Sequence, residues 1–488
     1  MKKIFYLFIA AIAFTAVSCD KDFEEINISP NSSPVTDPNL LLATTIINTQ
    51  NVIYNAQIGG DMGLCWAQHW SKVQYNDEER YIPRRGNMNA LWSSMYASVI
   101  AEASSAYELA GDQGNTNLQG AALVMKANAL QILTDVYGPV PFSEMGVEGN
   151  IKPVHDSQEA VYDGILAMLD EANTLLTGGS GEITATADLL YGGDVAKWKK
   201  FGNSLKLKAL MRIVKKKPAV ASQIQALVTA GNLMASNADS AQLMYMASQP
   251  DANPIYETIV NGNRAEYKVS SVLISGNYNP TSNPQGFVGL VASNDPRLAI
   301  YAKKNNANAY VGNVPGVENP GNYNGFSSPG TKYLDATLPG VLLSYAQVQL
   351  YLAEAANEGY ITGGVTTAEA SYFKGIKANL EFNGVSTADA NTYAAQVNLG
   401  FATQAGGRAK IGTQMWLALY GQGIEAWTEW RRTGVPALAP VANADGTVIP
   451  RRFYFSTDSQ NYNQVNYTAA AATLDNGDTM VSKVWWMN

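Results

Sequence analysis

Apolar residues recur every three or four positions over long stretches of this chain, and this spacing most constrains its fold. After Asp156 the apolar residues with this spacing are Val161, Ile165, Met168, Leu169, Ala172 and Leu176. After Asp194 they are Trp198, Phe201, Leu205, Ala209 and Ile213. A helix has 3.6 residues per turn, so each set forms one stripe on a helix. Both stretches are therefore predicted to be amphipathic helices.

Polar residues mark where these two helices begin and end. Asp156 with Glu159 three positions later has the spacing of a capping box, so a helix is predicted to start at Asp156. The second helix is predicted to follow Asp194 and to end in the lysines 215–217, before Pro218. Cations favour the negative end of the helix dipole, and proline cannot continue a helix. We interpret the lysine run as a solvated helix end rather than an anion site.

Two further helices, predicted near 344–357 and 366–380, are separated by a break at 359–364. Small alanines stand where the two would cross closely, so the pair resembles a tetratricopeptide hairpin, although the full repeat signature is absent. Similar alanine-rich segments cover 89–110 and 121–137. The fold class predicted is all-α, a scaffold of degenerate tetratricopeptide-like helix pairs packed into a curved array.

Two stretches lack this periodicity. Residues 277–324 contain eleven asparagines, with many glycines and prolines and interleaved tyrosines, so they are predicted to form a large irregular loop. Loops of this length inside a compact domain are usually functional or disordered, and the aromatics argue against plain disorder. The C-terminal residues 451–488 are similar, with short strands predicted at 452–456 and 481–486.

Composition excludes several classes of protein. Hydrophobic residues make up 46% of the 488 and charged residues 15%, which excludes an intrinsically disordered chain. The formal net charge of −8 means that the chain has no excess of positive charge with which to bind the phosphates of nucleic acid. With only two histidines, His69 and His155, and two cysteines, a histidine-rich metal site and a disulfide framework are excluded.

The N-terminus has the features of a bacterial lipoprotein leader. A basic Met-Lys-Lys start precedes an apolar run too short to span a membrane, and Ser18-Cys19 resembles a lipobox. We predict a signal peptide at 1–18, an acylated Cys19 with a tether at 19–36, and a single helical domain at 37–488. The alternative is an ordinary cleaved signal with a stray cysteine. If Cys19 is acylated, Cys65 has no partner, and it is predicted to be a small buried hydrophobe rather than a nucleophile.

The candidate ligand residues combine aromatic rings with polar edges. Sugar rings present C–H faces on which aromatic side chains stack, and hydroxyl edges that polar side chains bond. Trp66 and Trp70 lie four residues apart, so a helical core face is the alternative explanation for both. The full list of candidates is Trp66, His69, Trp70, Tyr75, Arg84 and Trp92, with Tyr310 and Tyr323 from the long loop.

Other chemistries find weaker support. Glu425 and Glu429, one helical turn apart, could suggest a glycosidase pair, but Arg431 and Arg432 beside them favour an ion-paired structural helix. The acidic and amide residues 458–478 could ligate calcium, yet they lack the twelve-residue loop spacing. Neither a phosphate loop nor a nucleophile elbow is present. The chain is therefore predicted to have no catalytic site, no metal and no cofactor.

Several segments together resemble the SusD/RagB family of nutrient-binding outer-membrane lipoproteins, in its SusD-like subgroup. They include Thr-Asp-Val-Tyr-Gly-Pro-Val-Pro-Phe at 134–142 and Asn-Asp-Pro-Arg-Leu at 294–298. The others are 19–31, 198–212, 345–358, 421–436 and 483–486. No single segment is diagnostic, but their order covers essentially the whole mature chain.

The resemblance implies four tetratricopeptide-like helix pairs and a ligand face built from irregular loops. It implies a lipid anchor in the outer leaflet of the outer membrane, so that the protein faces outward. There it would act as a lid on a SusC-like TonB-dependent β-barrel and deliver oligosaccharides or oligopeptides, without catalysis. Two alternatives stay open, a surface-anchored glycan hydrolase and a purely structural partner of the transporter.

Overall fold

The computed structural model describes residues 36–397, 401 and 403–487. The predicted signal peptide, the acylated Cys19 and the tether up to residue 35 lie outside the described residues. The chain from Pro38 onward forms one compact unit. No helix in the described part of the chain combines the length and apolarity that crossing a membrane requires.

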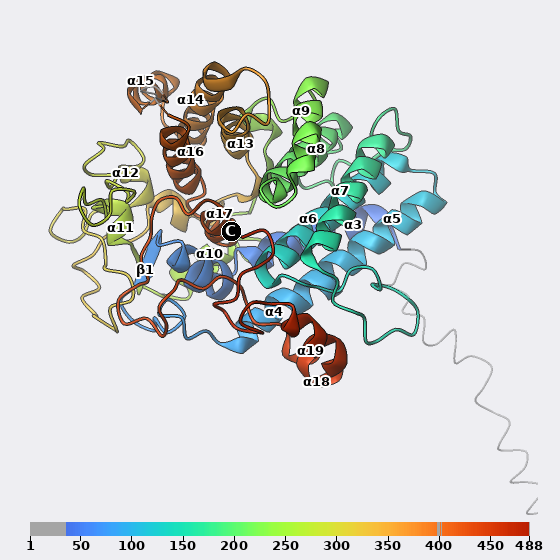
Figure 1. Cartoon of the computed structure of the whole chain (residues 1–488), viewed down its shortest axis with the longest axis horizontal. Helices are drawn as coiled ribbons and strands as arrows, with labels where there is room; N and C mark the ends of the chain where they lie inside the picture. Colours follow the sequence, from blue (N-terminus) through green and yellow to red (C-terminus); the bar gives the residue numbers. More distant parts are fainter. Residues whose placement is uncertain (1–35, 398–400, 402, 488) are drawn as a thin grey trace, which may run out of the picture. The chain divides into compact units, whose positions relative to one another are not determined.

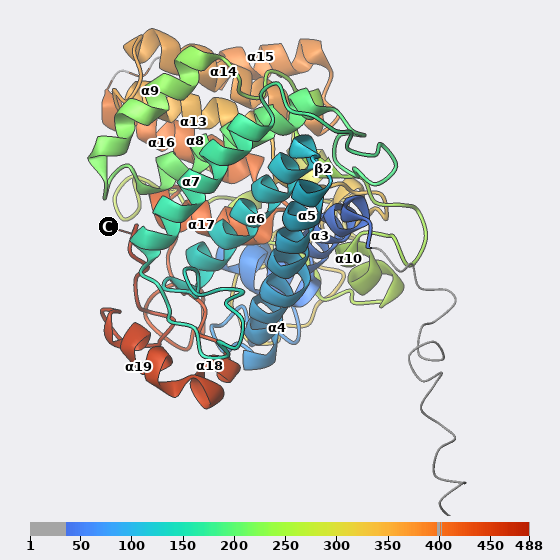
Figure 2. The ribbon, with the colours of Figure 1, turned by 90° about the vertical axis from the view of Figure 1, so that its right-hand side faces the viewer.

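Two groups of antiparallel helices build the scaffold, and they confirm the all-α prediction. The first group is α3 (Pro38–Ile53), α4 (Arg85–Met95), η2 (Tyr96–Ile100), α5 (Ala101–Asp112), α6 (Thr116–Tyr137), α7 (Gln158–Leu175), α8 (Val195–Ile213) and α9 (Ala221–Ala230). The second is α13 (Tyr345–Asn357), α14 (Gly364–Phe382), α15 (Thr387–Val397) and α16 (Gln404–Ala418). Sequential helices pack on each other, as Figures 1 and 2 show. The hairpin predicted at 344–357 and 366–380 is α13 with α14.

The predicted start of α8 is right, although the helix ends at Ile213, before the predicted lysines 215–217, and the predicted start of α7 is displaced. Asp194 caps α8, since its carboxylate accepts a hydrogen bond of 3.1 Å from the Lys197 amide. At α7 the cap is Ser157, which accepts from the Ala160 amide at 3.2 Å, so the predicted start at Asp156 is wrong by one residue. Asp156 instead accepts from the backbone amide of Phe142 at 2.9 Å and fixes the loop that precedes α7.

Strands are few and short. β1 (Trp70–Lys72) pairs antiparallel with β3 (Tyr267–Val269), and β2 (Ala241–Leu243) pairs antiparallel with β4 (Gly340–Leu343). The strands predicted at 452–456 and 481–486 are wrong, because both segments are irregular. Aromatic side chains of both segments pack instead on helix α17 (Gly423–Thr433), where Trp486 lies against Arg431. The Phe453 ring, for example, stacks on Trp427 at 5.5 Å.

A buried network of charges joins α17 to the neighbouring helices. Arg212 on α8 contacts Glu429 at 2.8 Å, and Lys208 contacts Glu425 at 2.9 Å. Arg432 binds Glu429 at 2.8 Å and also pairs with Glu354 on α13. Burial raises the pKa of Glu429, but Arg212 and Arg432 outweigh burial and lower it to about 2. The ion-paired structural helix predicted here is confirmed, and these carboxylates are not an acid/base pair.

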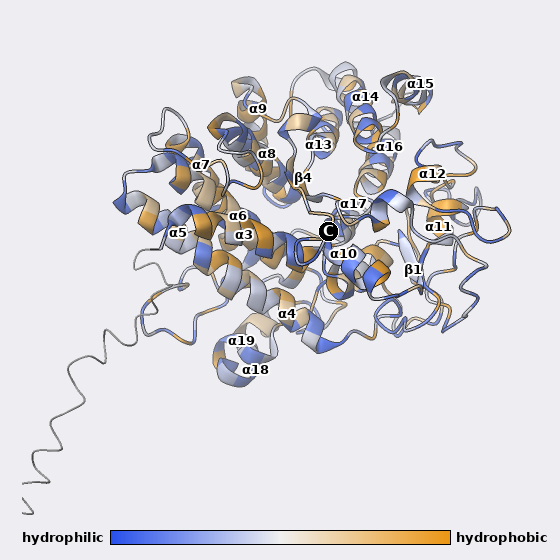
Figure 3. Cartoon of the chain, turned by 180° about the vertical axis from the view of Figure 1, so that it is seen from behind, coloured by the Kyte–Doolittle hydropathy of each residue, from blue (hydrophilic) through white to orange (hydrophobic). Residues whose placement is uncertain are grey.

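Irregular loops cover the side of the unit that lies away from the first group of helices (Figure 1). They surround β1 and the short helices α11 (Ser271–Ile274) and α12 (Leu298–Tyr301), and Figure 3 shows many hydrophilic positions along them. A second apolar core lies beneath these loops, with Trp416, Tyr301 and Tyr420 among its members. This second core therefore holds the inner side of the loops, and their outer side faces away from it.

Candidate functional site

An open groove of about 680 Å³ lies where the segment after β1 meets the segment before β3 and the long loop. Each of the three segments contributes side chains, although they are far apart in sequence. The lining residues are Gln74, Tyr75, Arg84, Asn263, Arg264, Ala265, Glu266 and Tyr323. Three of the eight residues proposed from the sequence, Tyr75, Arg84 and Tyr323, are therefore brought together by the fold.

Three of the other candidates are core residues. Trp66 and His69 have no exposed surface, and Trp70 is 1% exposed. The Trp66 indole N–H donates to the Glu78 carbonyl oxygen at 2.8 Å, and the Trp70 indole N–H donates to the Tyr420 hydroxyl at 2.8 Å. A ligand cannot reach side chains enclosed in this way, so the candidate site leaves them out. Their role in this structure is to hold the segment that carries Tyr75.

His69 shows why the chemistry of these residues is structural. Its ring lies 4.5 Å from the Trp416 ring and 5.5 Å from the Tyr420 ring. Burial lowers its pKa to about 3. The imidazole is therefore neutral at physiological pH and packs as an aromatic ring. Cys65 beside it is also fully buried, as predicted, and burial raises the pKa of its thiol.

Buried charges below the groove tie β1 to the long loop. The Lys72 ammonium contacts Asp61 at 3.0 Å, and the Tyr267 hydroxyl donates to the same carboxylate at 2.7 Å. Glu79 accepts from the backbone amides of Lys72 at 2.9 Å and Gly316 at 3.0 Å. Burial raises the pKa of Glu79 to about 7, against the lowering effect of its hydrogen bonds. Glu79 thus joins two of the segments that hold the groove.

Two tyrosines present ring surface to the groove. Tyr75 is 55% exposed and its backbone φ is +52°, a value that residues other than glycine and asparagine seldom adopt. Its amide donates to Asn319 Oδ1 at 3.0 Å, which helps hold this conformation. The Tyr323 hydroxyl donates to the Gln74 side chain, so that ring is also fixed. An exposed aromatic held in a strained backbone conformation suggests a binding role.

Two arginines supply hydrogen-bond donors beside these rings. Arg264 pairs with Glu266 at 2.5 Å, and its guanidinium lies 5.5 Å from the centre of the Tyr75 ring. Arg84 pairs through Nε with Glu78 at 2.9 Å, and its side chain is 63% exposed. A guanidinium has five N–H donors, so each arginine keeps donors beyond its ion pair. The groove therefore offers flat apolar faces bordered by fixed polar donors.

The remaining candidates lie elsewhere. Trp92 on α4 borders a separate hollow beside the helices. Tyr310 packs at the edge of the second core, with Lys304 5.7 Å from its ring. Asn263, Arg264 and Glu266 were not among the residues proposed from the sequence. No periodic pattern marks their turn, and only the pairing of β3 with β1 brings it to the groove.

The described residues offer no metal centre. Among residues 36–397, 401 and 403–487, no three His, Cys, Asp or Glu side chains come close enough to hold an ion. Asp478, considered above for calcium, pairs instead with Arg452 at 2.6 Å and accepts from the Phe455 amide at 3.0 Å. Its oxygens are thus used in fixing the C-terminal segment.

A helix-pair scaffold that displays an aromatic and arginine-lined groove on irregular loops defines a binding protein. The family model SusD-like, described as starch-binding and associating with the outer membrane, matches residues 30–456. The chain therefore belongs to the SusD-like family, whose members are binding proteins and not enzymes. No curated protein matches the sequence.

Solved structures agree with this assignment. A chitin-binding protein shares 28% identity and a TM-score of 0.80, over 93% of this chain and 100% of its own. A chitin-binding SusD homologue from Flavobacterium johnsoniae shares 24% identity and a TM-score of 0.78, over 92% of this chain and 98% of its own. A SusD homologue from Bacteroides uniformis shares 23% identity and a TM-score of 0.79, over 92% of this chain and 98% of its own. The last two support the fold alone.

Proposed function

We propose that this protein is an outward-facing outer-membrane lipoprotein that captures oligosaccharides in the groove and delivers them to a SusC-like TonB-dependent β-barrel. The observation that carries the proposal is the meeting of Tyr75, Tyr323 and Arg264 from three separate segments. Ring faces suit the C–H surface of a sugar, and guanidinium N–H groups suit its hydroxyl oxygens. The leader and Cys19 support the lipid anchor.

Oligosaccharides of N-acetylglucosamine are the first ligands we would test. The relative that is 28% identical is named a chitin-binding protein. The groove also holds amide side chains, Gln74 and Asn263, which can bond an acetamido group. Aromatic and amide groups serve peptides as well, so an oligopeptide of similar length is the competing ligand to include.

Delivery requires no chemistry at the groove. A ligand held weakly on a tethered lid has a high effective concentration above the barrel, and release then competes with uptake. The lid and barrel arrangement is inferred from family membership. Detergent extraction of the full-length lipoprotein, followed by mass spectrometry of what co-purifies, should recover a large β-barrel in stoichiometric amount. Recovery of the lipoprotein alone would count against the transporter partner.

The binding test uses two matched tyrosines. Tyr75 in the groove is 55% exposed and Tyr278 outside it is 49% exposed. We expect Tyr75→Asn to weaken binding of the N-acetylglucosamine hexamer about tenfold, which corresponds to ~1.4 kcal/mol of lost contact. Tyr278→Asn should leave the affinity unchanged. Equal effects of the two substitutions, or none from either, would contradict the groove as the site.

The two alternatives make different predictions for the same samples. A glycan hydrolase would shorten the hexamer during incubation, which product chromatography detects. A purely structural partner would support uptake normally with Tyr75→Asn and Tyr323→Ala combined. We expect an intact hexamer and reduced uptake. The ion-paired state of Glu425 and Glu429 supports the first expectation, since neither carboxylate is free to act as an acid or a base.

A further inference from the structure

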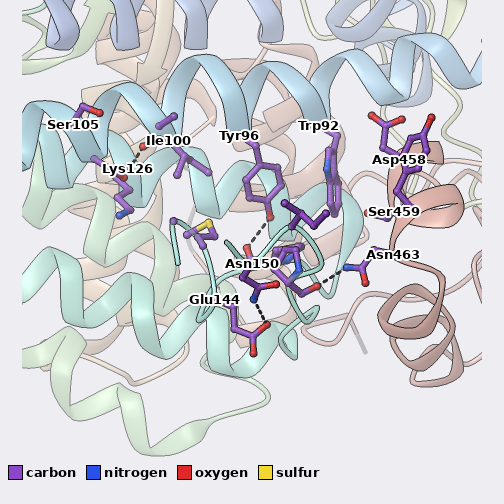
Figure 4. A pocket seen from close by; sticks show the side chains of 18 of the residues that line it. Trp92, Tyr96, Ile100, Ser105, Lys126, Glu144, Asn150, Asp458, Ser459 and Asn463 are labelled. Atoms are coloured by element: carbon purple, nitrogen blue, oxygen red, sulfur yellow. Dashed lines mark hydrogen bonds between the residues drawn. The ribbon is translucent and has the colours of Figure 1, made fainter. Parts of the chain in front are cut away.

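A second hollow, of about 830 Å³, lies beside the helical scaffold and shares no lining residue with the groove. Its walls come from the continuous helix α4–η2–α5, from α6, from the loop after α6 and from α18 (Thr457–Tyr462). Figure 4 shows the Trp92 and Tyr96 side chains pointing from the helix toward the loop that carries Glu144 and Asn150. A volume of this size is typical of a site for a small ligand.

The aromatic wall of this hollow is fixed. The Trp92 and Tyr96 rings lie 5.1 Å apart, and the Tyr96 hydroxyl donates to the Pro141 carbonyl oxygen at 2.8 Å. Tyr462 on α18 also lines the hollow and is 71% exposed. Trp92 is 8% exposed and contributes only its ring edge, so Tyr462 supplies the open aromatic face on which a sugar ring can stack.

The opposite wall is held by hydrogen bonds from both sides. Glu144 accepts from the Asn150 side chain at 3.0 Å and from the Val154 amide at 2.9 Å. Asn463, just after α18, donates from its side chain to the Pro153 carbonyl oxygen at 2.6 Å. The loop is thus bound to itself and to the C-terminal helices. The hollow is preformed, so a ligand need not order it.

Charge limits what this hollow can accept. Its lining includes three carboxylates from three elements, Glu108, Glu144 and Asp458, and one ammonium, Lys126. Burial lowers the pKa of Lys126, although Glu108 and Glu171 act to raise it. An anionic ligand would meet net negative charge at close range, whereas a neutral or amine-bearing ligand would not.

From this geometry we infer that the hollow between Trp92, Tyr462 and Asn150 is a second saccharide site, one that favours neutral or amine-bearing sugars over anionic ones. The inference rests on the proposed function, since it takes saccharides to be what the protein binds. Two sites on one chain would let it hold a long polysaccharide at two points, which raises avidity without new contacts in the groove.

The test counts binding sites calorimetrically on the full mature chain. The probes are the hexamers of N-acetylglucosamine (neutral), glucosamine (cationic) and galacturonic acid (anionic). The variants are Tyr75→Asn in the groove, Tyr462→Ala and Ser105→Trp in the second hollow, and Val465→Ala, 83% exposed and outside both sites, as control. Tyr462→Ala removes a ring, whereas Ser105→Trp fills the space, so two opposite changes test one site.

We expect two binding events for the first two hexamers with the wild type. Tyr462→Ala and Ser105→Trp should each weaken one event about tenfold, and Tyr75→Asn should weaken the other. If Tyr75→Asn weakens all binding and both hollow variants match Val465→Ala, the second site is refuted and the proposed function stands. If the wild type binds no saccharide, the proposed function itself fails. Tight binding of the galacturonate hexamer in the hollow would refute the charge selectivity.

Discussion

The network around α17 and the groove beside β1 use the same residue types for opposite purposes. At α17, Arg212 has no exposed side-chain surface and its carboxylate partners are nearly as buried. At the groove, Arg264 pairs with Glu266 but keeps 37% of its side chain exposed. An arginine enclosed on all sides stabilises the fold, whereas one with an open side keeps donors for a ligand. Exposure, rather than residue type, is what differs between the two regions.

The largest expected effect comes from breaking the enclosed network. Arg212→Met takes the 2.8 Å partner from the buried Glu429 and one of two cations from Glu425, which keeps Lys208, and breaking such a buried pair typically costs about 3–5 kcal/mol. We expect the free energy of unfolding, measured by urea denaturation, to fall by that amount. The matched control is Arg408→Met, because Arg408 pairs with Glu358 but is 48% exposed. It should change stability by less than ~1 kcal/mol. If both variants lost a similar free energy of unfolding, the difference between enclosed and exposed arginines would not hold.

A smaller effect is expected from Glu79, which is fully buried below the groove. Its pKa of about 7 is raised above that of an exposed glutamate, so the folded state holds its proton more tightly than the unfolded state does. This group's contribution to stability is therefore complete at low pH and is lost as pH rises from about 4.5 to about 7.

Glu79→Gln removes that titration. Between pH 5 and pH 7.5 we expect the wild type to lose stability relative to the variant, since only the wild type must bury a newly formed charge. Urea denaturation at both pH values measures the difference. Glu318→Gln is the control, because Glu318 is 61% exposed in its pair with Arg80. A difference between wild type and Glu79→Gln that does not change with pH would show that Glu79 titrates normally.

The third prediction addresses the open side of the comparison. Arg264→Lys keeps a positive charge next to Glu266 but loses the planar fork of donors. We expect the affinity for the N-acetylglucosamine hexamer to fall about fivefold, which is ~1 kcal/mol, with an unchanged unfolding temperature. Arg408→Lys, outside the groove and 48% exposed, should change neither quantity. A lower unfolding temperature without a change in affinity would place Arg264 among the structural arginines.

The sequence predicted the scaffold better than the site, and particular residues show why. Periodicity depends on local spacing, so the sequence predicts α8 and the hairpin of α13 and α14. It also predicts that Glu429 pairs with arginine. Trp66 and Trp70 looked equally suited to a ligand or a core, and sequence spacing cannot measure exposure. Arg264 reaches the groove only through the pairing of β3 with β1, about 195 residues apart, which no local pattern records.

The smallest effect should come from the charges of the second hollow. Asp458 and Glu108 are exposed, so water and salt screen their repulsion of an anionic sugar. Replacing them together, by Asp458→Asn and Glu108→Gln, should increase binding of the galacturonate hexamer two- to threefold at low salt, or by ~0.5 kcal/mol. The increase should vanish at high salt, where repulsion is already screened. Neutral hexamer binding should not change, because stacking on Tyr462 involves no charge. A gain that persists at high salt would mean that shape, and not charge, excludes the anion.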